Sequence, residues 1–127
     1  MNSIARIDID DPNVDMDEAQ RITYRGEPFT GEVAEYQNGH LVSLDEYTDG
    51  ILNGKCREWY QDGTLRSDGI VRDGRAVGES KEWHPNGALK SRKFFDNSAA
   101  SLREEDTWDE DGTHVTSWRR DKYQTNQ

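Results

Sequence analysis

The feature that most constrains this chain is a series of evenly spaced turn glycines. Gly39, Gly63 and Gly87 are separated by equal intervals, and Gly112 follows after an interval only one position longer. Asn or Asp precedes the glycine every time, and a leucine stands two positions after the first three, at Leu41, Leu65 and Leu89. A fixed period of this kind is typical of a stacked repeat, in which each unit buries its face only against its neighbours.

Each unit is predicted to be a β-hairpin. Asn-Gly and Asp-Gly favour tight two-residue turns, because both residues tolerate the positive φ that such turns need. The predicted strand pairs are 31–37 with 41–48, 54–61 with 65–72, and 78–84 with 88–95, linked by half-unit turns at Asp49-Gly50 and Asp73-Gly74. No stretch has helical periodicity with caps. The predicted fold class is all-β: an elongated single-layer antiparallel β-meander of hairpin repeats.

Composition agrees with a thin array. Hydrophobic residues make up 31% of the 127 residues and charged residues 33%, which is too little apolar material for a thick two-layer core. The repeat decays after Phe95, and a last unit ends at Gly112, as expected for a terminal repeat that caps the array. The predicted divisions are an acidic N-terminal segment (1–20), a repeat domain (21–118) and a polar tail (119–127).

The N-terminal segment carries six acids against one base, Arg6. Ile7 and Ile9 alternate with acids and could form an edge strand, followed by a turn at residues 11–13. Two interpretations stay open: a solvated acidic lead-in, or an arm that docks on a basic partner. The second interpretation makes the acids partner-binding candidates, together with an acidic cluster before the last turn: Asp8, Asp10, Asp11, Asp15, Asp17, Glu18, Glu104, Glu105 and Asp106.

The recurring pattern resembles a known repeat family. The residues that carry it are Gly31, Tyr36, Asn38-Gly39, Leu41, Tyr47 and Asp49-Gly50 in the first unit, with counterparts at Gly54, Trp59-Tyr60, Asp62-Gly63 and Leu65, and at Gly78, Trp83-His84, Asn86-Gly87, Leu89 and Phe94. Over about residues 25 to 112 they resemble the MORN-repeat variant of bacterial antitoxin and immunity proteins, the YwqK-like family. The resemblance implies a hairpin meander with stacked aromatics that neutralises a toxin by direct binding.

Nothing in the sequence predicts catalysis. His40, His84 and His114 have no metal-ligand spacing with each other or with the single Cys56. A calcium loop with Gly112 at its sixth position would need oxygen ligands where Thr107 and Trp118 stand, so the match fails at the twelfth. Phosphate-binding loops and nucleophile elbows are missing too. We expect no enzyme, cofactor or metal site, although an enzyme of unknown class is kept as a third hypothesis.

The aromatic residues are the other binding candidates. Neighbours along a strand point to opposite faces, so one member of each adjacent pair can pack the array while the other is exposed. We expect Trp59, Trp83 and Trp108 to pack. Tyr36, Tyr60 and His84 are candidates for contact with a partner.

Net charge points to the class of partner. At −10 the chain should be repelled by nucleic acid and by anionic lipid and attracted to basic surfaces, although acidity could serve solubility alone. A chain with no membrane-length apolar stretch and one cysteine suits the cytoplasm. The leading hypothesis is an immunity or antitoxin protein, monomeric when free, that blocks the active site of a cognate toxin, such as a nuclease with a basic cleft. No small-molecule substrate is expected. The alternative is a MORN-type scaffold or membrane-surface module.

Overall fold

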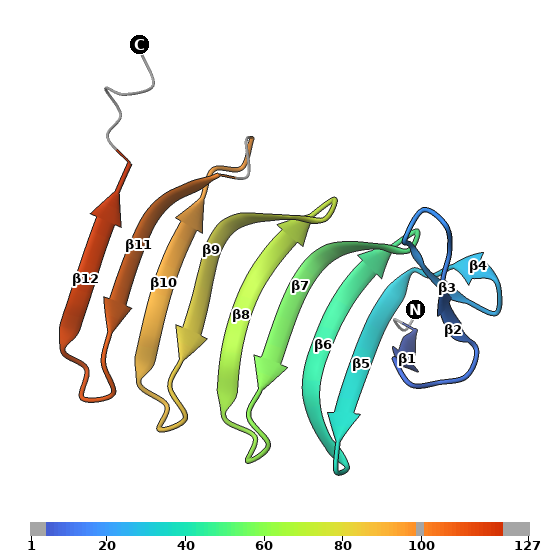
Figure 1. Ribbon diagram of the computed structural model, residues 1–127, viewed down its shortest axis with the longest axis horizontal. Helices are drawn as coiled ribbons and strands as arrows, with labels where there is room; N and C mark the ends of the chain where they lie inside the picture. The colour runs from blue at the N-terminus through green and yellow to red at the C-terminus, as the bar shows by residue number, and fades with distance from the viewer. Residues whose placement is uncertain (1–4, 99–100, 121–127) are drawn as a thin grey trace, which may run out of the picture.

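The computed structural model describes residues 5–98 and 101–120, and every regular element among them is a strand (Figure 1). Four short strands come first: β1 (Arg6–Asp8), β2 (Val14–Met16), β3 (Ile22–Tyr24) and β4 (Glu27–Pro28). Eight longer strands follow: β5 (Gly31–Gln37), β6 (His40–Thr48), β7 (Ile51–Trp59), β8 (Leu65–Arg72), β9 (Arg75–Trp83), β10 (Leu89–Phe95), β11 (Leu102–Trp108) and β12 (His114–Arg119). No helix in these residues is long and apolar enough to span a membrane.

The long strands form one open sheet. Its order is β1-β5-β6-β7-β8-β9-β10-β11-β12, so from β5 onward each strand pairs with the next along the chain. These pairings are all antiparallel. The predicted antiparallel meander of hairpins is therefore confirmed. β1 is an addition to it, because this strand pairs parallel with β5 through Ile7↔Val33, at the place where an edge strand was predicted.

Turn geometry departs from the prediction at three hairpins. Positive φ at both central residues occurs at Asn38-Gly39, Asp49-Gly50 and Asp73-Gly74. In the hairpins that contain Gly63, Gly87 and Gly112 only the glycine has positive φ. There the loop is wider, as Figure 1 shows along its lower edge: Gly63 N–H donates to the Tyr60 carbonyl at 3.0 Å, and Tyr60 N–H donates to that of Thr64 at 2.9 Å.

A side-chain hydrogen bond accounts for the wider loops. The Asp62 carboxylate accepts from Thr64 N–H at 2.9 Å, and the Asn86 amide oxygen accepts from Ala88 N–H at 2.9 Å. These bonds stabilise an Asx-type turn within a longer loop. The strands before them consequently end at Trp59 and Trp83, slightly before the predicted ends.

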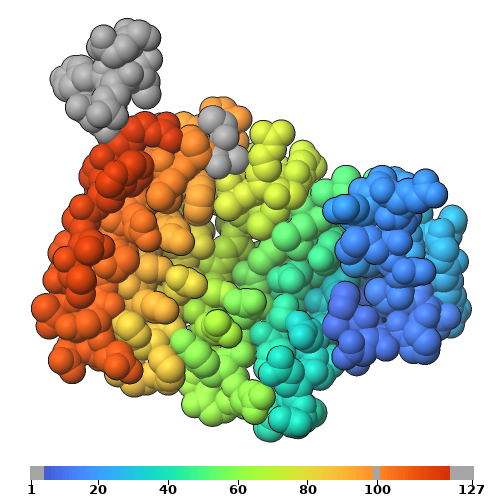
Figure 2. Space-filling view, viewed as in Figure 1, coloured from blue at the N-terminus to red at the C-terminus, as the bar shows by residue number. Residues whose placement is uncertain are grey.

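The largest hydrophobic cluster lies at the N-terminal end of the sheet. β2, β3 and β4 form a separate three-stranded sheet there. Ile22, Phe29 and Val33 are 7%, 8% and 5% exposed, and the partly buried Ile7, Ile9, Val14, Tyr24 and Tyr47 pack against them. The N-terminal segment thus packs against β5 and β6, whereas β8–β12 form a single layer. Figure 2 shows these N-terminal residues (blue) against the strands at that end.

Two predicted features fall partly outside the described residues. Arg119 ends β12 and Arg120 is described, whereas the rest of the predicted polar tail, residues 121–127, lies outside. The link between β10 and β11 contains residues 99–100, which also lie outside, and it is closed by Asp96 N–H donating to the Ser101 carbonyl at 2.8 Å.

Candidate partner-binding surface

One face of the long sheet carries a row of carboxylates and hydroxyls, which alternate from β5 to β10. Residues paired across neighbouring strands point to the same face, and the register pairs these residues in succession from β5 to β12: Glu35, Ser43, Glu58, Ser67, Glu82, Ser91, Thr107 and Thr116. We call this the Glu/Ser row, and the face that carries it the Glu/Ser face.

Serine hydroxyls hold two of these carboxylates in place. Ser67 Oγ donates to Glu58 Oε1 at 3.0 Å, and Ser91 Oγ donates to Glu82 Oε1 at 3.1 Å. Each bond joins the two strands of one hairpin. The outermost pair, Thr107 and Thr116, is joined by a bond between hydroxyls. The row therefore presents two hydrogen-bonded carboxylates, Glu58 and Glu82, one repeat apart.

The opposite face has a different charge pattern. There the paired residues from β7 to β11 form a row of both signs, which we call the mixed-charge row: Arg57, Asp68, Lys81, Arg92 and Asp106. Ion pairs cross this face, including Arg92 to Glu79 and Arg119 to Asp106. The Arg92 guanidinium lowers the pKa of Glu79 below the ordinary glutamate range.

Four carboxylates of the Glu/Ser face have no such partner among the described residues. Within residues 5–98 and 101–120, no ion pair includes Glu35, Asp45, Glu58 or Glu82. Surface ion pairs contribute little stability, but a carboxylate without one is available to a basic group from outside. The Glu/Ser face is therefore acidic, with carboxylates that are open to a basic group, whereas ion pairs such as Arg92 with Glu79 and Arg119 with Asp106 offset part of the charge on the mixed-charge face.

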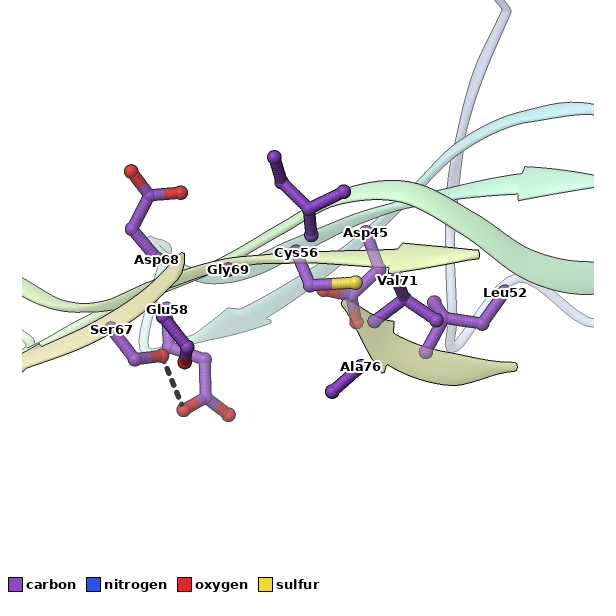
Figure 3. Close-up of a pocket in the computed structure, with 11 residues that line it drawn as sticks. Asp45, Leu52, Cys56, Glu58, Ser67, Asp68, Gly69, Val71 and Ala76 are labelled. Carbon is purple, nitrogen blue, oxygen red and sulfur yellow. Dashed lines mark hydrogen bonds between the residues drawn. The ribbon is translucent and has the colours of Figure 1, made fainter. Parts of the chain in front are cut away.

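A hollow of about 310 Å³ opens near the middle of the Glu/Ser face (Figure 3). Asp45, Cys56 and Glu58 lie on one side of it, with Ser67 donating to Glu58. Burial raises the pKa of Asp45, and burial beside that carboxylate raises the pKa of the Cys56 thiol to about 12. Cys56 is thus a protonated thiol at neutral pH, which is unsuited to nucleophilic catalysis.

Metal binding has no support in the described part of the chain, where no group of three or more His, Cys, Asp or Glu side chains could hold an ion. The three histidines have other contacts or positions. His84 contacts a backbone carbonyl, His114 lies beside Trp108 with ring centroids 5.6 Å apart, and His40 begins β6.

Two of the three aromatic residues predicted to contact a partner, Tyr60 and His84, form contacts between neighbouring repeats. Tyr60 Oη donates to the Trp83 carbonyl at 2.8 Å, and His84 Nε2 lies 2.9 Å from the Trp108 carbonyl. Each of these contacts spans about one repeat along the chain, so each fastens one hairpin end to the next. Tyr36, the equivalent residue in the first unit, is exposed. Contact with a partner stays a prediction for all three.

Four of the six N-terminal acids shape their own segment. Asp8 and Asp11 accept backbone N–H groups two positions ahead at 2.8 Å. Asp15 accepts from Met16 N–H at 2.8 Å. Asp17 accepts from Arg21 N–H and forms an ion pair with its side chain, which lowers the pKa of Asp17. Asp10 and Glu18 are exposed.

The two acidic clusters that were both predicted to bind a partner lie far apart in the structure. The N-terminal acids lie beside β5, and Glu104–Asp106 lie on β11 near the other end (Figure 1). Strand alternation also divides the second cluster. Glu105 points to the Glu/Ser face, whereas Glu104 and Asp106 point to the mixed-charge face and bind Arg119. Asp106 is 8% exposed, so it is a structural residue of the β11–β12 pair.

Sequence reasoning missed the Glu/Ser row. The signal was available in the spacing, because Glu35, Glu58 and Glu82 recur once per repeat and the serines follow the same period. The register was not available: it contains bulges such as the one between Glu58 and Trp59, and these decide which residues of the two strands stand opposite each other.

Comparison with known proteins supports the repeat assignment for the middle of the array. No curated protein and no solved structure matches the chain. Residues 52–71 and 76–97, which include most of β7–β10, match the family model described as the MORN repeat variant, so this part of the chain carries two MORN-variant repeats.

Proposed function

We propose that this chain is an immunity or antitoxin protein, which lays its Glu/Ser face over the basic active-site cleft of a cognate toxin and blocks it. One observation carries the proposal: the carboxylates of the Glu/Ser row, two of them bonded to serines, form no ion pair among the described residues, whereas ion pairs offset part of the charge on the opposite face. The two MORN-variant repeats agree with a binding scaffold. The choice of a toxin as the partner is based on the resemblance of the repeat pattern to antitoxin and immunity proteins.

Electrostatics explains how such a face would work. The net charge of −10 would attract a basic partner from a distance and raise the association rate. Toxins that act on nucleic acid need basic clefts to bind phosphate, so a nuclease is the partner class that this face suits best. Apolar contacts at the centre of the interface would then set the dissociation rate.

Co-expression with the toxin encoded beside this gene is the first test. Cells that carry the toxin should survive when the chain is present. Killing that continues unchanged at equal toxin levels would count against the proposal.

Charge reversal on the two faces sharpens this test. Replacing Glu58 and Glu82 together by Lys should slow association at least about tenfold and reduce protection. Glu79 and Glu104, replaced together by Lys on the opposite face, are the control of equal charge change and should leave the association rate within about twofold. Stopped-flow measurement of the association rate at low and high salt isolates the contribution of long-range electrostatic attraction, because salt screens it. Equal effects on both faces would contradict the assignment of the Glu/Ser face.

The alternative, a scaffold or membrane-surface module, has one supporting observation. The mixed-charge row places Arg57, Lys81 and Arg92 on one face. An anionic bilayer prefers a continuous basic stripe, and here acids interrupt the row and occupy two of its cations. Flotation with phosphatidylserine vesicles tests this alternative: co-flotation that Arg92→Glu abolishes would favour it over toxin binding.

A further inference from the structure

Gly69 is an exception among the glycines of this chain. The other ten have positive φ, which explains why a glycine stands there, whereas Gly69 does not. It lies inside β8. A glycine weakens a strand because it loses more backbone entropy on folding than other residues do and has no side chain to pack. The repeat does not need it either, because Asp45 and Lys93 stand at the equivalent places one repeat before and one repeat after.

The missing side chain opens a cavity. Gly69 faces Ser80, itself small, and a Cβ built on Gly69 would lie 3.2 Å from Ser80 Oγ. These two residues form part of the wall of the hollow of about 310 Å³ on the Glu/Ser face. A larger residue at either place would narrow it. Glycine in a strand interior often marks a place where a ligand or another chain comes close. The cavity beside Gly69 provides the space for such a group.

The cavity wall has an acidic part and an apolar part. Asp45 and Glu58 form the acidic part, and Leu52, Val71 and Ala76 form the apolar part (Figure 3). Neither carboxylate has an ion pair within the described ranges. The wall therefore complements a group that is cationic at its tip and aliphatic along its stem.

We infer that this cavity receives one arginine side chain of the protein partner, with its guanidinium against Asp45 and Glu58 and its stem against the apolar wall. The volume lies at the lower end of the range for small-molecule pockets, which suits a single long side chain. Arginine is enriched among residues that dominate interface energy, and its planar group can bind two carboxylates at once. The inference rests on the proposed function, because it names what the toxin would insert.

Gly69→Val is the decisive variant. Valine favours strands, and the backbone at Gly69 is not left-handed, so the variant should fold with at least wild-type stability once the Ser80 hydroxyl turns aside. It should nevertheless occupy part of the cavity and narrow it. Lys93→Val, the same side chain at the same repeat position outside the cavity, is the steric control. Because it also removes a positive charge opposite Ser80, its electrostatic effect on the binding of a cation should be an increase and not a loss. Asp45→Asn removes the charge and keeps the shape, so the test survives if Gly69→Val does not fold.

The first experiment needs no toxin. The ¹⁵N-labelled full chain is titrated with Nα-acetyl-arginine amide, and with the citrulline analogue as the uncharged comparison. We expect saturable shift changes confined to residues 45, 56, 58 and 67–71, with a Kd of about millimolar order. Gly69→Val and Asp45→Asn should each weaken binding at least about tenfold, and Lys93→Val should not. Shifts that do not saturate, lie elsewhere or appear equally with citrulline would overturn the inference.

The second experiment uses the toxin and separates the two proposals. Gly69→Val should raise the Kd for the toxin about thirtyfold or more, and Lys93→Val should leave it within about threefold. A wild-type chain that does not bind the toxin would sink the proposed function, while the arginine titration still decides the cavity. Wild-type neutralisation that Gly69→Val leaves intact would sink only the cavity inference. Binding of the arginine derivative without an effect of Gly69→Val on toxin affinity would assign the cavity to a small cationic ligand instead.

Discussion

The two ends of the long sheet are stabilised by different forces. At the N-terminal end, β1 and the small β2-β3-β4 sheet cover β5 and bury Ile22, Phe29 and Val33. At the C-terminal end every residue of β12 is exposed. There the last pair depends on polar contacts, such as Asp106 with Arg119 and Thr107 with Thr116. The hairpin repeat thus supplies strand pairing along the whole array, whereas a cluster of buried apolar side chains forms only where the N-terminal segment packs against β5 and β6.

This difference predicts unequal local stability. Regions with few buried apolar contacts open at lower free energy than the global transition. β12 is therefore expected to detach from β11 before the N-terminal core unfolds. The following changes test that order, beginning with the largest expected effect.

Removal of the Phe29 ring should have the largest effect. Phe29→Ala deletes a buried aromatic side chain from the N-terminal cluster, where it also contacts Tyr24 edge-on at 6.3 Å between ring centroids. The expected loss in free energy of unfolding is about 3–5 kcal/mol, which is a large share of the stability of a domain of this size. Urea denaturation followed by circular dichroism measures it. A loss below about 1 kcal/mol, the ordinary cost of an average substitution, would mean that the cluster does not stabilise the array.

A matched pair of glycine variants compares the ends at constant backbone conformation. Gly50 and Gly112 have φ of 81° and 86°, so alanine is strained at both, by about 1–2 kcal/mol. At Gly50 the new Cβ would also lie 2.7 Å from Arg21 Cβ and from the Ile22 carbonyl oxygen, whereas at Gly112 it meets open space.

Gly50→Ala should therefore cost about 2–4 kcal/mol, because crowding is added to strain. Gly112→Ala should cost only the strain. Thermal unfolding of the two variants measures the difference. Equal costs would show that the N-terminal segment shifts easily away from the β6–β7 turn.

Acid should release the C-terminal end first. Hydrogen bonds from Arg119, and then from Ser117, lower the pKa of Asp106 below the ordinary aspartate range. The stabilisation from the ionised carboxylate is therefore complete above that range, and it is lost as the pH falls through the lowered pKa.

NMR shifts of β12 amides should report this loss while the amides of β3 keep their native shifts. In Asp106→Asn the β12 transition should vanish. Simultaneous loss of β3 and β12 shifts at one pH would instead indicate a single cooperative unit.

Truncation of Trp118 should have the smallest effect. This side chain is 46% exposed on the terminal strand, and exposed substitutions usually change stability by less than about 0.5 kcal/mol. Trp118→Ala thus deletes a larger aromatic group than Phe29→Ala at a small fraction of the cost. The same denaturation assay compares them. A loss for Trp118→Ala as large as the loss for Phe29→Ala would contradict the ranking of the two ends.

The fold could be predicted because its main signal is local. Asn38-Gly39 or Asp73-Gly74 can form a turn without reference to the rest of the chain, so their spacing places the hairpins. Loop width could not be predicted, because the Asp62 and Asn86 side chains compete for backbone N–H groups in ways that a two-residue motif does not reveal. The parallel partner of β1 was also hidden, since β5 lies far from it along the chain, beyond β2, β3 and β4.

The candidate site was harder to predict, because it depends on contacts between residues that are far apart in the sequence. Acid-rich stretches were visible, yet Asp11 and Asp17 bind their own backbone and Asp106 is buried against Arg119. The carboxylates of the Glu/Ser row are instead spread along the chain, one to a repeat, at Glu35, Glu58 and Glu82. Only pairing across the strands gathers them into a row.

By itself the sequence determined where the chain turns, that it forms hairpins in series, and that its charge is strongly negative, because each of these follows from local backbone preference or from composition. The tertiary structure alone decided which side chains share a face, which carboxylates are neutralised, where Gly69 leaves a cavity, and which end of the sheet has a core. Those properties depend on contacts between residues far apart in the chain, and cross-strand register sets them.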